Sequence, residues 1–97
     1  MLLMCTRKEQ VLMHLARING GVYREIMPFG TTQDGIADGI GISRGHASIV
    51  LKQLETDGMV YHERRIADGG KIHRNCYRLM PYGWMAVREI IADQEAM

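Results

Sequence analysis

Residues 31–58 read TTQDGIADGIGISRGHASIVLKQLETDG, and this stretch decides the fold. Thr31 and Thr32 are both candidate N-caps of a short helix, because a Thr hydroxyl accepts a hydrogen bond from a backbone N–H of the first turn. Ser43 is placed to cap a longer helix that stops at Gly58. The apolar residues recur at helical spacing, with Ile36, Ala37 and Ile40 in the first helix and Ala47, Val50, Leu51 and Leu54 in the second. The pattern predicts two helices that each bury one face.

The residues between these helices predict a tight turn. Gly39 and Gly41 are expected to end the first helix, and Gly41 can adopt the positive φ that the turn needs. Ile42 can fill the angle between the helices, and the second helix keeps a polar outer face. Two helices joined in this way are typical of a helix-turn-helix, whose second helix enters the major groove of DNA.

After Gly58 the period of the apolar residues changes from about 3.6 to about 2. Residues 59–66 and 72–79 are rich in β-branched and aromatic residues and flank Asp68-Gly69-Gly70, which predicts a β-hairpin. Pro81 suits a first helical turn, so a last helix is expected to begin there. Its apolar stripe contains Trp84, Val87 and Ile91.

Before residue 31, Thr6-Arg7-Lys8-Glu9 has the pattern of a capping box and predicts another helix start. Helical spacing continues through Val11, Leu12, Leu15 and Ile18, and Asn19-Gly20-Gly21 supplies the stop. Residues 22–26 fit a short strand or a helical turn equally well. The order helix, helix, helix, hairpin, helix predicts an α+β fold that is mainly α.

Length and composition limit the class of protein. The chain has 97 residues, 46% of them hydrophobic and 24% charged, which fits one globular domain over residues 1–97 and excludes a two-domain enzyme. The net charge is +1, but residues 44–78 hold seven basic and four acidic side chains, so this part is locally cationic. Cys5 and Cys76 are too few for a disulfide framework, and no signal peptide or membrane span is visible. We therefore expect a cytoplasmic protein without membrane association.

Residues 31–79 together resemble the winged helix-turn-helix domain of small prokaryotic transcription regulators. The stretch is similar to the multiple-antibiotic-resistance regulator (MarR-like) type and looks closest to archaeal versions. The spacing from Gln33-Asp34-Gly35-Ile36-Ala37 to Leu54-Glu55-x-x-Gly58, followed by Tyr77-x-Leu79, carries the resemblance. Gly83 keeps the last position of the Tyr-x-Leu-Thr-x-x-Gly pattern, but Met80 replaces its Thr. The resemblance implies a three-helix core, a hairpin wing and a C-terminal helix.

This resemblance implies sequence-specific binding of double-stranded DNA in transcriptional control. The alternative is a winged-helix module that binds proteins and not DNA, because one fold hosts several functions. A DNA-binding domain needs a cationic, exposed second helix and hairpin, whereas an interaction module would expose an apolar patch there. The cationic stretch favours DNA.

Candidate DNA contacts lie on the outer face of the helix after Ser43. Arg44 can donate two hydrogen bonds to guanine, and Ile49 can contact a thymine methyl group. The full set on this face is Arg44, Gly45, His46, Ser48, Ile49 and Lys52. Arg44 and Lys52 could also belong to a helix face that is only solvated. We favour DNA contact, because a helix-turn-helix turn precedes them and a basic hairpin follows.

The hairpin and the start of the preceding helix supply candidate phosphate contacts. The basic side chains near the hairpin tip are Arg64, Arg65, Lys71, His73 and Arg74. Charge on a hairpin edge also prevents aggregation, and both explanations can hold together. Thr32 and Gln33, with Thr31, are placed at a helix start that can bind phosphate.

The sequence does not favour an enzyme, a cofactor or a metal site. The four histidines are scattered, and no nucleophile or carboxylate pair is spaced for catalysis. A zinc site from His62, His73 and Cys76 is disfavoured, because x-x spacing on a strand directs His73 and Cys76 to opposite faces. Cys5 is expected to be an inert thiol and not a redox switch.

Apolar residues at the chain ends predict a homodimer. Residues 1–4 and the stripe of Trp84, Val87 and Ile91 have no obvious place in a three-helix and hairpin core. Packing across a two-fold axis would set two half-sites about 34 Å apart. Alternatively, the last helix folds back against the first helix of its own chain.

Overall fold

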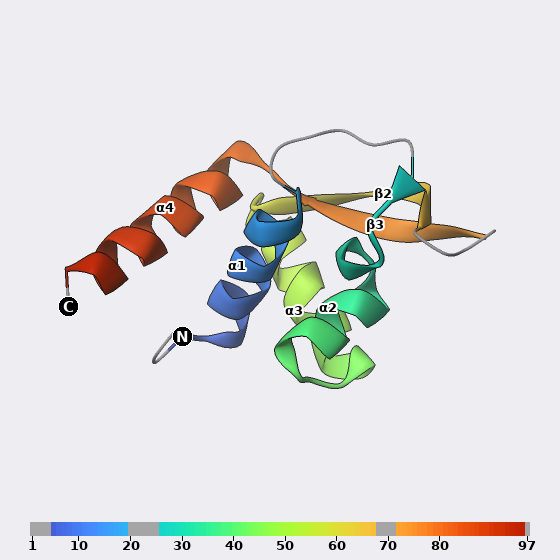
Figure 1. The fold of residues 1–97 in the computed structure, drawn as a ribbon, viewed down its shortest axis with the longest axis horizontal. Coiled ribbons are helices and arrows are strands. Elements are labelled where there is room, and N and C mark those ends of the chain that lie inside the picture. Colours follow the sequence, from blue (N-terminus) through green and yellow to red (C-terminus); the bar gives the residue numbers. More distant parts are fainter. Residues whose placement is uncertain (1–4, 20–25, 68–71, 97) are drawn as a thin grey trace.

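The computed structural model describes residues 5–19, 26–67 and 72–96. The elements, in chain order, are α1 (Arg7–Asn19), β1 (Ile26–Met27), the 3-10 turn η1 (Phe29–Thr31), α2 (Gln33–Ile40), α3 (Arg44–Thr56), β2 (Val60–Ala67), β3 (His73–Leu79) and α4 (Pro81–Glu95). Figure 1 shows the hairpin of β2 and β3 extending from one end of the molecule and α4 from the other, with α1, α2 and α3 between them. The predicted winged helix-turn-helix, α+β and mainly α, is confirmed.

The predicted capping box is present at the start of α1. The Glu9 N–H donates to Thr6 Oγ1 at 3.2 Å, and the Thr6 N–H donates to Glu9 Oε1 at 2.9 Å. Each side chain thereby satisfies a backbone donor that a helix start leaves unpaired. The predicted stop at Asn19-Gly20-Gly21 and most of the segment 22–26 lie outside the described residues.

Threonine and serine caps begin the two helices of the helix-turn-helix. Of the two candidates, Thr32 is the N-cap of α2, and its Oγ1 accepts from the Gly35 N–H at 3.0 Å. Gly41 ends α2 with a φ of 74°. Ser43 then caps α3 by accepting from the His46 N–H at 3.1 Å.

Gly39 is the exception, because it lies inside α2 and not at its end. A Cβ at this position would overlap the ring of His14 on α1. The glycine therefore lets α1 and α2 approach closely, which turn-forming propensity alone does not reveal.

The three strands form one sheet in the order β1-β2-β3. β2 and β3 are antiparallel from the Val60↔Leu79 pair at the base to Ile66↔His73 near the tip, and β1 adds two parallel pairs to β2. An isolated bridge between Thr32 and Cys76 joins the start of α2 to β3. The wing is therefore tied to the helix-turn-helix by main-chain pairing.

The core lies where α1, α2 and α3 meet the base of the hairpin. Its buried members are Val11, Leu12, Leu15, Ile36, Val50, Leu51, Leu54, Val60, Tyr77, Leu79, Val87 and Ile90. The helical stripes predicted from the sequence supply most of this list, so burial of these faces positions α3.

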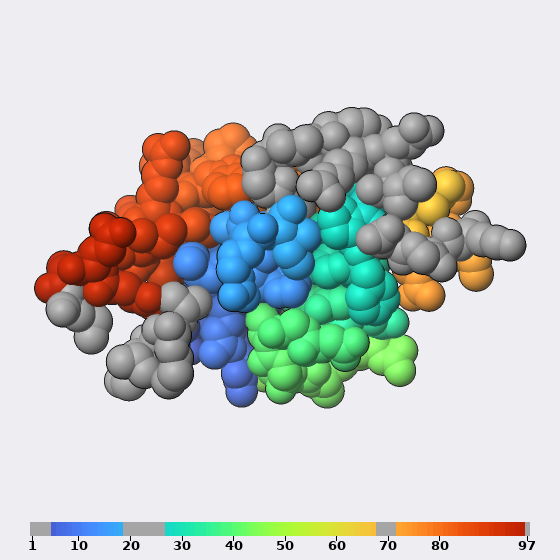
Figure 2. Space-filling view, in the orientation of Figure 1, coloured from blue at the N-terminus to red at the C-terminus, as the bar shows by residue number. Residues whose placement is uncertain are grey.

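α4 starts at Pro81, the first helical position, and its N-cap Met80 makes no side-chain capping bond. A Cβ on Gly83 would overlap the Met59 carbonyl oxygen, so this glycine allows α4 to cross the backbone before β2. The expectation that Trp84 and Val87 lie outside the core is wrong: Val87 is buried beside Ile90 against α1, and Trp84 is partly buried against the same core. Ile91 is exposed as expected, and residues 1–4 lie outside the described residues. Figure 2 shows that the far half of α4 nevertheless projects from the body. None of the described helices is long and apolar enough to cross a membrane.

Candidate nucleic-acid interface

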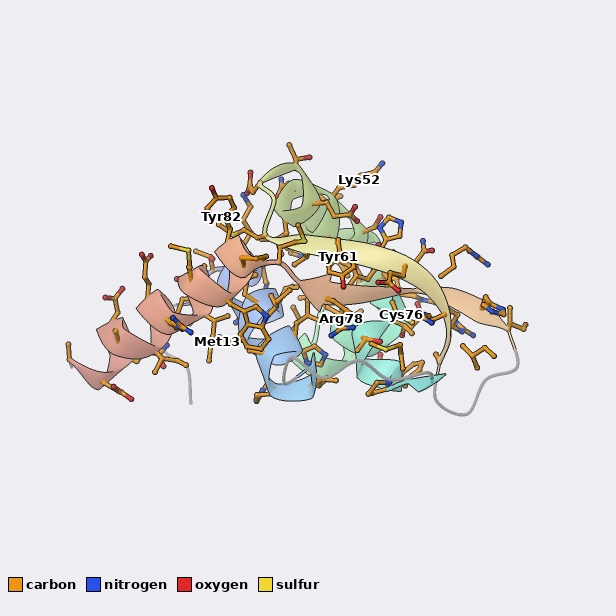
Figure 3. The ribbon with its side chains drawn as sticks, turned by 90° about the horizontal axis from the view of Figure 1, so that it is seen from above. Met13, Lys52, Tyr61, Cys76, Arg78 and Tyr82 are labelled. Atoms are coloured by element: carbon orange, nitrogen blue, oxygen red, sulfur yellow. The ribbon has the colours of Figure 1, made fainter. Side chains whose placement is uncertain are left out.

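The outer face of α3 is exposed as predicted. Because Ala47, Val50, Leu51 and Leu54 are buried, the opposite face turns to solvent. Its exposed residues are Arg44, Gly45, His46, Ile49 and Lys52, with Ser48 half-buried. Figure 3 shows Lys52 extending from α3 away from the body of the molecule.

Basic side chains of the wing gather on the part of the hairpin nearest to α2. Arg64 is exposed, and its Nη2 donates to the His73 carbonyl across the hairpin at 3.0 Å. His73 and Arg74 are also exposed. This bond fixes the Arg64 guanidinium over β3 and leaves its other donors for a ligand.

A shallow open groove of about 490 Å³ lies between the first turn of α2 and the wing. Its lining residues are Thr32, Gln33, Asp34, Arg64, Ile72, His73, Arg74 and Asn75. The Thr32↔Cys76 bridge sets the distance between the two walls. The groove is open to solvent, so it suits an extended polar ligand better than a small enclosed one.

Asp34 is the site residue that sequence reasoning missed. Its Oδ2 lies 3.6 Å from Nη1 of Arg44 on α3 and 3.6 Å from Nη1 of Arg74 on β3. Arg44 and Arg74 are 30 residues apart in sequence, yet they share one carboxylate oxygen. Acidic residues are common in the first turn of a helix, so the sequence position of Asp34 does not mark it as a site residue. Its two arginine partners become visible only in the tertiary structure.

Gln33 makes a structural contact within the candidate interface, and its predicted phosphate contact stays a prediction. Its side-chain Nε2 donates to the Arg44 carbonyl oxygen at 3.1 Å, which links the start of α2 to the start of α3. Gln33 therefore supports the orientation of α3 from inside the interface.

The structure argues against a contact through the Thr32 side chain. Thr32 is 2% exposed, and its hydroxyl donates to the Phe29 carbonyl at 2.7 Å while it accepts from Gly35. Thr31 is fully buried and bonded to Pro28 in the same way. Capping of α2 by Thr32 and the bond from Thr31 to Pro28 therefore occupy the two hydroxyls, and only backbone N–H groups of this helix start are left for a phosphate.

Two other basic residues of the wing, Arg65 and Lys71, are predicted phosphate contacts. The Arg65 side chain is 28% exposed, and its Nε donates to Glu63 at 3.0 Å on the strand face opposite to Arg64. Arg65 shares this face with its cross-strand partner Arg74. Its charge is therefore partly compensated by Glu63, and a phosphate contact of Arg65 stays a prediction. Lys71 lies outside the described residues.

A polar contact ties the base of the wing to α3. His62 Nδ1 lies 2.8 Å from Glu55 Oε1, and the His62 ring packs beside Tyr77 with centroids 5.4 Å apart. Burial, followed by the Glu55 charge, raises the pKa of the Tyr77 hydroxyl. These contacts fix the position of the base of the wing relative to α3.

No metal-binding cluster of three His, Cys, Asp or Glu side chains occurs within residues 5–19, 26–67 and 72–96. Cys76 is buried with Met27 and Ala67, whereas His73 is exposed near the tip. Alternation along β3 places these two side chains on opposite faces, as the spacing predicts.

No protein-family model matches the sequence, and a search of curated proteins gives no match. Among solved structures, a variant of MepR from Staphylococcus aureus aligns with 97% of this chain and 61% of its own, at a TM-score of 0.74 and 18% identity. MepR in a complex with DNA aligns with 97% of this chain and 59% of its own, at a TM-score of 0.72 and 19% identity.

A MarR family transcription regulator aligns with 97% of this chain and 54% of its own, at a TM-score of 0.69 and 19% identity. The chain thus spans less than two thirds of the length of these structures. At these identities the comparison establishes the fold, which is that of winged-helix transcription regulators.

Proposed function

We propose that this protein binds double-stranded DNA as a MarR-like transcriptional regulator. One observation carries the proposal: an exposed arginine in the first turn of α3 and an exposed arginine on the wing converge at Asp34. A helix that enters the major groove and a wing that reaches the adjacent backbone must present their cations on one continuous surface.

The residues of α3 are assigned to the bases. The Arg44 side chain is 74% exposed at the start of α3, where a helix in the major groove makes its base contacts. Ser48, Ile49 and Lys52 continue the same face, and Gly45 and His46 flank it. Two bonds from one guanidinium to guanine O6 and N7 would give Arg44 the strongest base preference.

The wing residues are assigned to phosphates. Arg64, His73 and Arg74 line the groove, and Lys71 belongs to the same predicted set. Contacts of this kind hold the protein on the duplex without selecting a sequence. Glu63 compensates part of the charge of Arg65, so we expect Arg65 to contribute less to phosphate binding than these residues do.

Two further observations support the proposal. The solved structures with this fold include MepR bound to DNA. On the outer face of α3, Ile49 is the only exposed large apolar residue among those described, so this face offers no apolar patch of the kind that an interaction module needs. The similarity to archaeal regulators and the cytoplasmic location remain predictions.

We also infer that the DNA-binding form is a homodimer that pairs through α4. Tyr82 is 67% exposed and Met85 54% exposed on this helix, and Ile91 is 40% exposed further along it. A second copy would cover these side chains and place two α3 helices about one helical turn of DNA apart.

A fluorescence-anisotropy titration with a 30-bp random-sequence duplex tests DNA binding. The affinity of the wild type is expected to fall steeply with salt. In a plot of log association constant against log salt concentration, each phosphate contact should contribute about −0.9 to the slope. Arg64→Ala and Arg74→Ala should each reduce this slope by about 1. Arg17→Ala, an exposed residue of α1 outside both proposed surfaces, is the matched control and should leave the slope unchanged. Equal effects of all three substitutions would contradict the proposed surface.

A further inference from the structure

A carboxylate lies within the surface that is proposed to receive phosphates. Among the described residues that line the groove, Asp34 is the only acidic one. Its Oδ2 is 3.6 Å from both arginine Nη1 atoms, which is an ion-pair distance and longer than a good hydrogen bond. A negative charge here repels DNA, so it opposes affinity for every duplex.

The position of Asp34 is set by buried contacts. It lies two residues after Thr32, which caps α2 and bridges to Cys76 on β3. A Cβ on Gly35 would overlap the Phe29 carbonyl, so the first turn of α2 lies directly against η1. Arg74 is two residues before Cys76 and therefore shares its strand face. Asp34 and Arg74 are thus attached to the same main-chain bridge.

Arg44 is restrained at two points by consecutive residues of α2. Gln33 binds its carbonyl oxygen at 3.1 Å, and the Asp34 carboxylate pairs with its guanidinium. The Arg44 side chain is otherwise largely solvent-exposed and has several rotatable bonds. An ion pair that limits these rotations prepares the planar guanidinium for a two-bond contact to one base.

We propose that Asp34 is a positioning and specificity-determining residue for the DNA binding proposed above, on which this inference rests. Its carboxylate orients Arg44 and Arg74 and competes with phosphates for them. A correctly placed guanine offers Arg44 two acceptors and offsets this competition, whereas a random sequence offers phosphate oxygens alone. Asp34 therefore weakens binding to random sequence more than binding to the preferred sequence.

Asp34→Asn tests this role, with Asp38→Asn as the matched control. Asp38 lies four residues later on α2, is exposed, and forms no ion pair within the described part of the chain. Both substitutions remove one negative charge from one helix. The probes are the duplex that wild type selects from a random pool and a scrambled duplex of the same composition.

Asp34→Asn is expected to tighten binding to the scrambled duplex by about three- to tenfold. This factor is the effect on affinity expected when the two exposed ion pairs of Asp34 no longer compete with phosphates. The ratio of selected to scrambled affinity should fall by a similar factor, while Asp38→Asn leaves this ratio at the wild-type value. Asp34→Glu keeps the charge and should restore most of the discrimination. In an Arg44→Ala background, Asp34→Asn should lose most of its effect on the ratio.

An unchanged ratio in Asp34→Asn would overturn the role of Asp34 and leave DNA binding intact. A wild-type protein that does not distinguish the two duplexes would overturn the proposed function and this inference together. Thermal unfolding of both Asn variants checks the fold. If Asp34→Asn fails to fold, Asp34→Ser takes its place, because serine is favourable at a helix start.

Discussion

At the residue scale, Arg44 is the most important side chain of the proposed DNA-binding surface. Its guanidinium is exposed at the start of α3 and restrained by Asp34, an arrangement suited to a base contact. The sequence identified Arg44 from helical spacing, because four buried apolar residues fix which side of α3 faces outward. Asp34 could not be identified in that way, since its role depends on two arginines that only the folded chain brings together.

Arg44→Lys separates charge from geometry at this position. Lysine keeps the positive charge but lacks the planar pair of donors, so the preferred base at one position of the selected sequence should be lost. We expect a loss of about 1–3 kcal/mol in discrimination at that base pair and a small change in affinity for scrambled DNA. Selection from a random duplex pool measures both, and an identical selected sequence for variant and wild type would remove Arg44 from base reading.

His14 gives a second prediction at this scale, on stability. It is buried between α1 and η1 with Nε2 at 2.8 Å from the Gly30 carbonyl, and burial is the main cause of its lowered pKa. Because the pKa is lower in the folded chain than its ordinary value of 6.5, the unfolded chain binds more protons as the pH falls below that value. The contribution of His14 to stability is therefore complete above pH 6.5 and decreases as the pH falls towards the folded-state pKa.

Denaturant unfolding between pH 7.5 and 5 measures this effect. In the wild type, the free energy of unfolding should decrease as the pH falls. His14→Gln should make this slope smaller, by at most about 1.4 kcal/mol per pH unit. His46→Gln, an exposed histidine on α3, is the control and should keep the wild-type slope. Equal slopes in all three proteins would show that His14 does not cause the pH dependence.

At the element scale, helix boundaries followed the sequence where local chemistry decides them. The Thr6 and Glu9 capping box, the Ser43 cap and the Gly41 turn all act within four residues, and each is present. Gly39 was misassigned because its partner, His14, lies on another helix. Val87 was misassigned for the same kind of reason, since an apolar stripe does not say which surface will cover it.

Gly45 allows a test of whether α3 approaches DNA closely. Among the described residues outside its own turn of α3, a Cβ at this position meets no atom within 4 Å, so Gly45→Ala should fold normally and gain up to about 1 kcal/mol of helix stability. If the face of α3 around Gly45 lies against bases, the added methyl group should weaken DNA binding severalfold. Melting temperature and duplex affinity are measured together, and unaltered affinity would place Gly45 away from the DNA.

At the scale of the whole molecule, α4 is the element proposed to link DNA binding to dimerisation. The principal extents of 44, 27 and 25 Å reflect an elongated shape with the wing and α4 at opposite ends (Figure 1). The core-facing side of α4 packs on α1, as the alternative to the dimer anticipated, while Tyr82 and Met85 remain exposed. These two observations are compatible, because an exposed apolar surface remains for a second copy.

Sedimentation at micromolar concentration is expected to give twice the 11.0 kDa mass of one chain. Met85→Glu places a charge on the exposed surface of α4 and should shift the protein to a monomer with weakened DNA affinity, although α4 and the tip of the wing lie at opposite ends of the molecule (Figure 1). Arg17→Gln, on the exposed side of α1, changes the net charge by the same amount and is the control. A wild-type protein that stays monomeric and binds an asymmetric site would contradict the dimer.

The central claim is that α3 and the wing form one DNA-binding surface. Backbone amide chemical shifts, followed by NMR as the selected duplex is added, test it most directly. We expect the largest changes at residues 44–49 on α3, in the first turn of α2 and at residues 73–75 on the wing, with smaller changes at residues 7–19 of α1. Changes confined to α4, or spread evenly over the molecule, would contradict it.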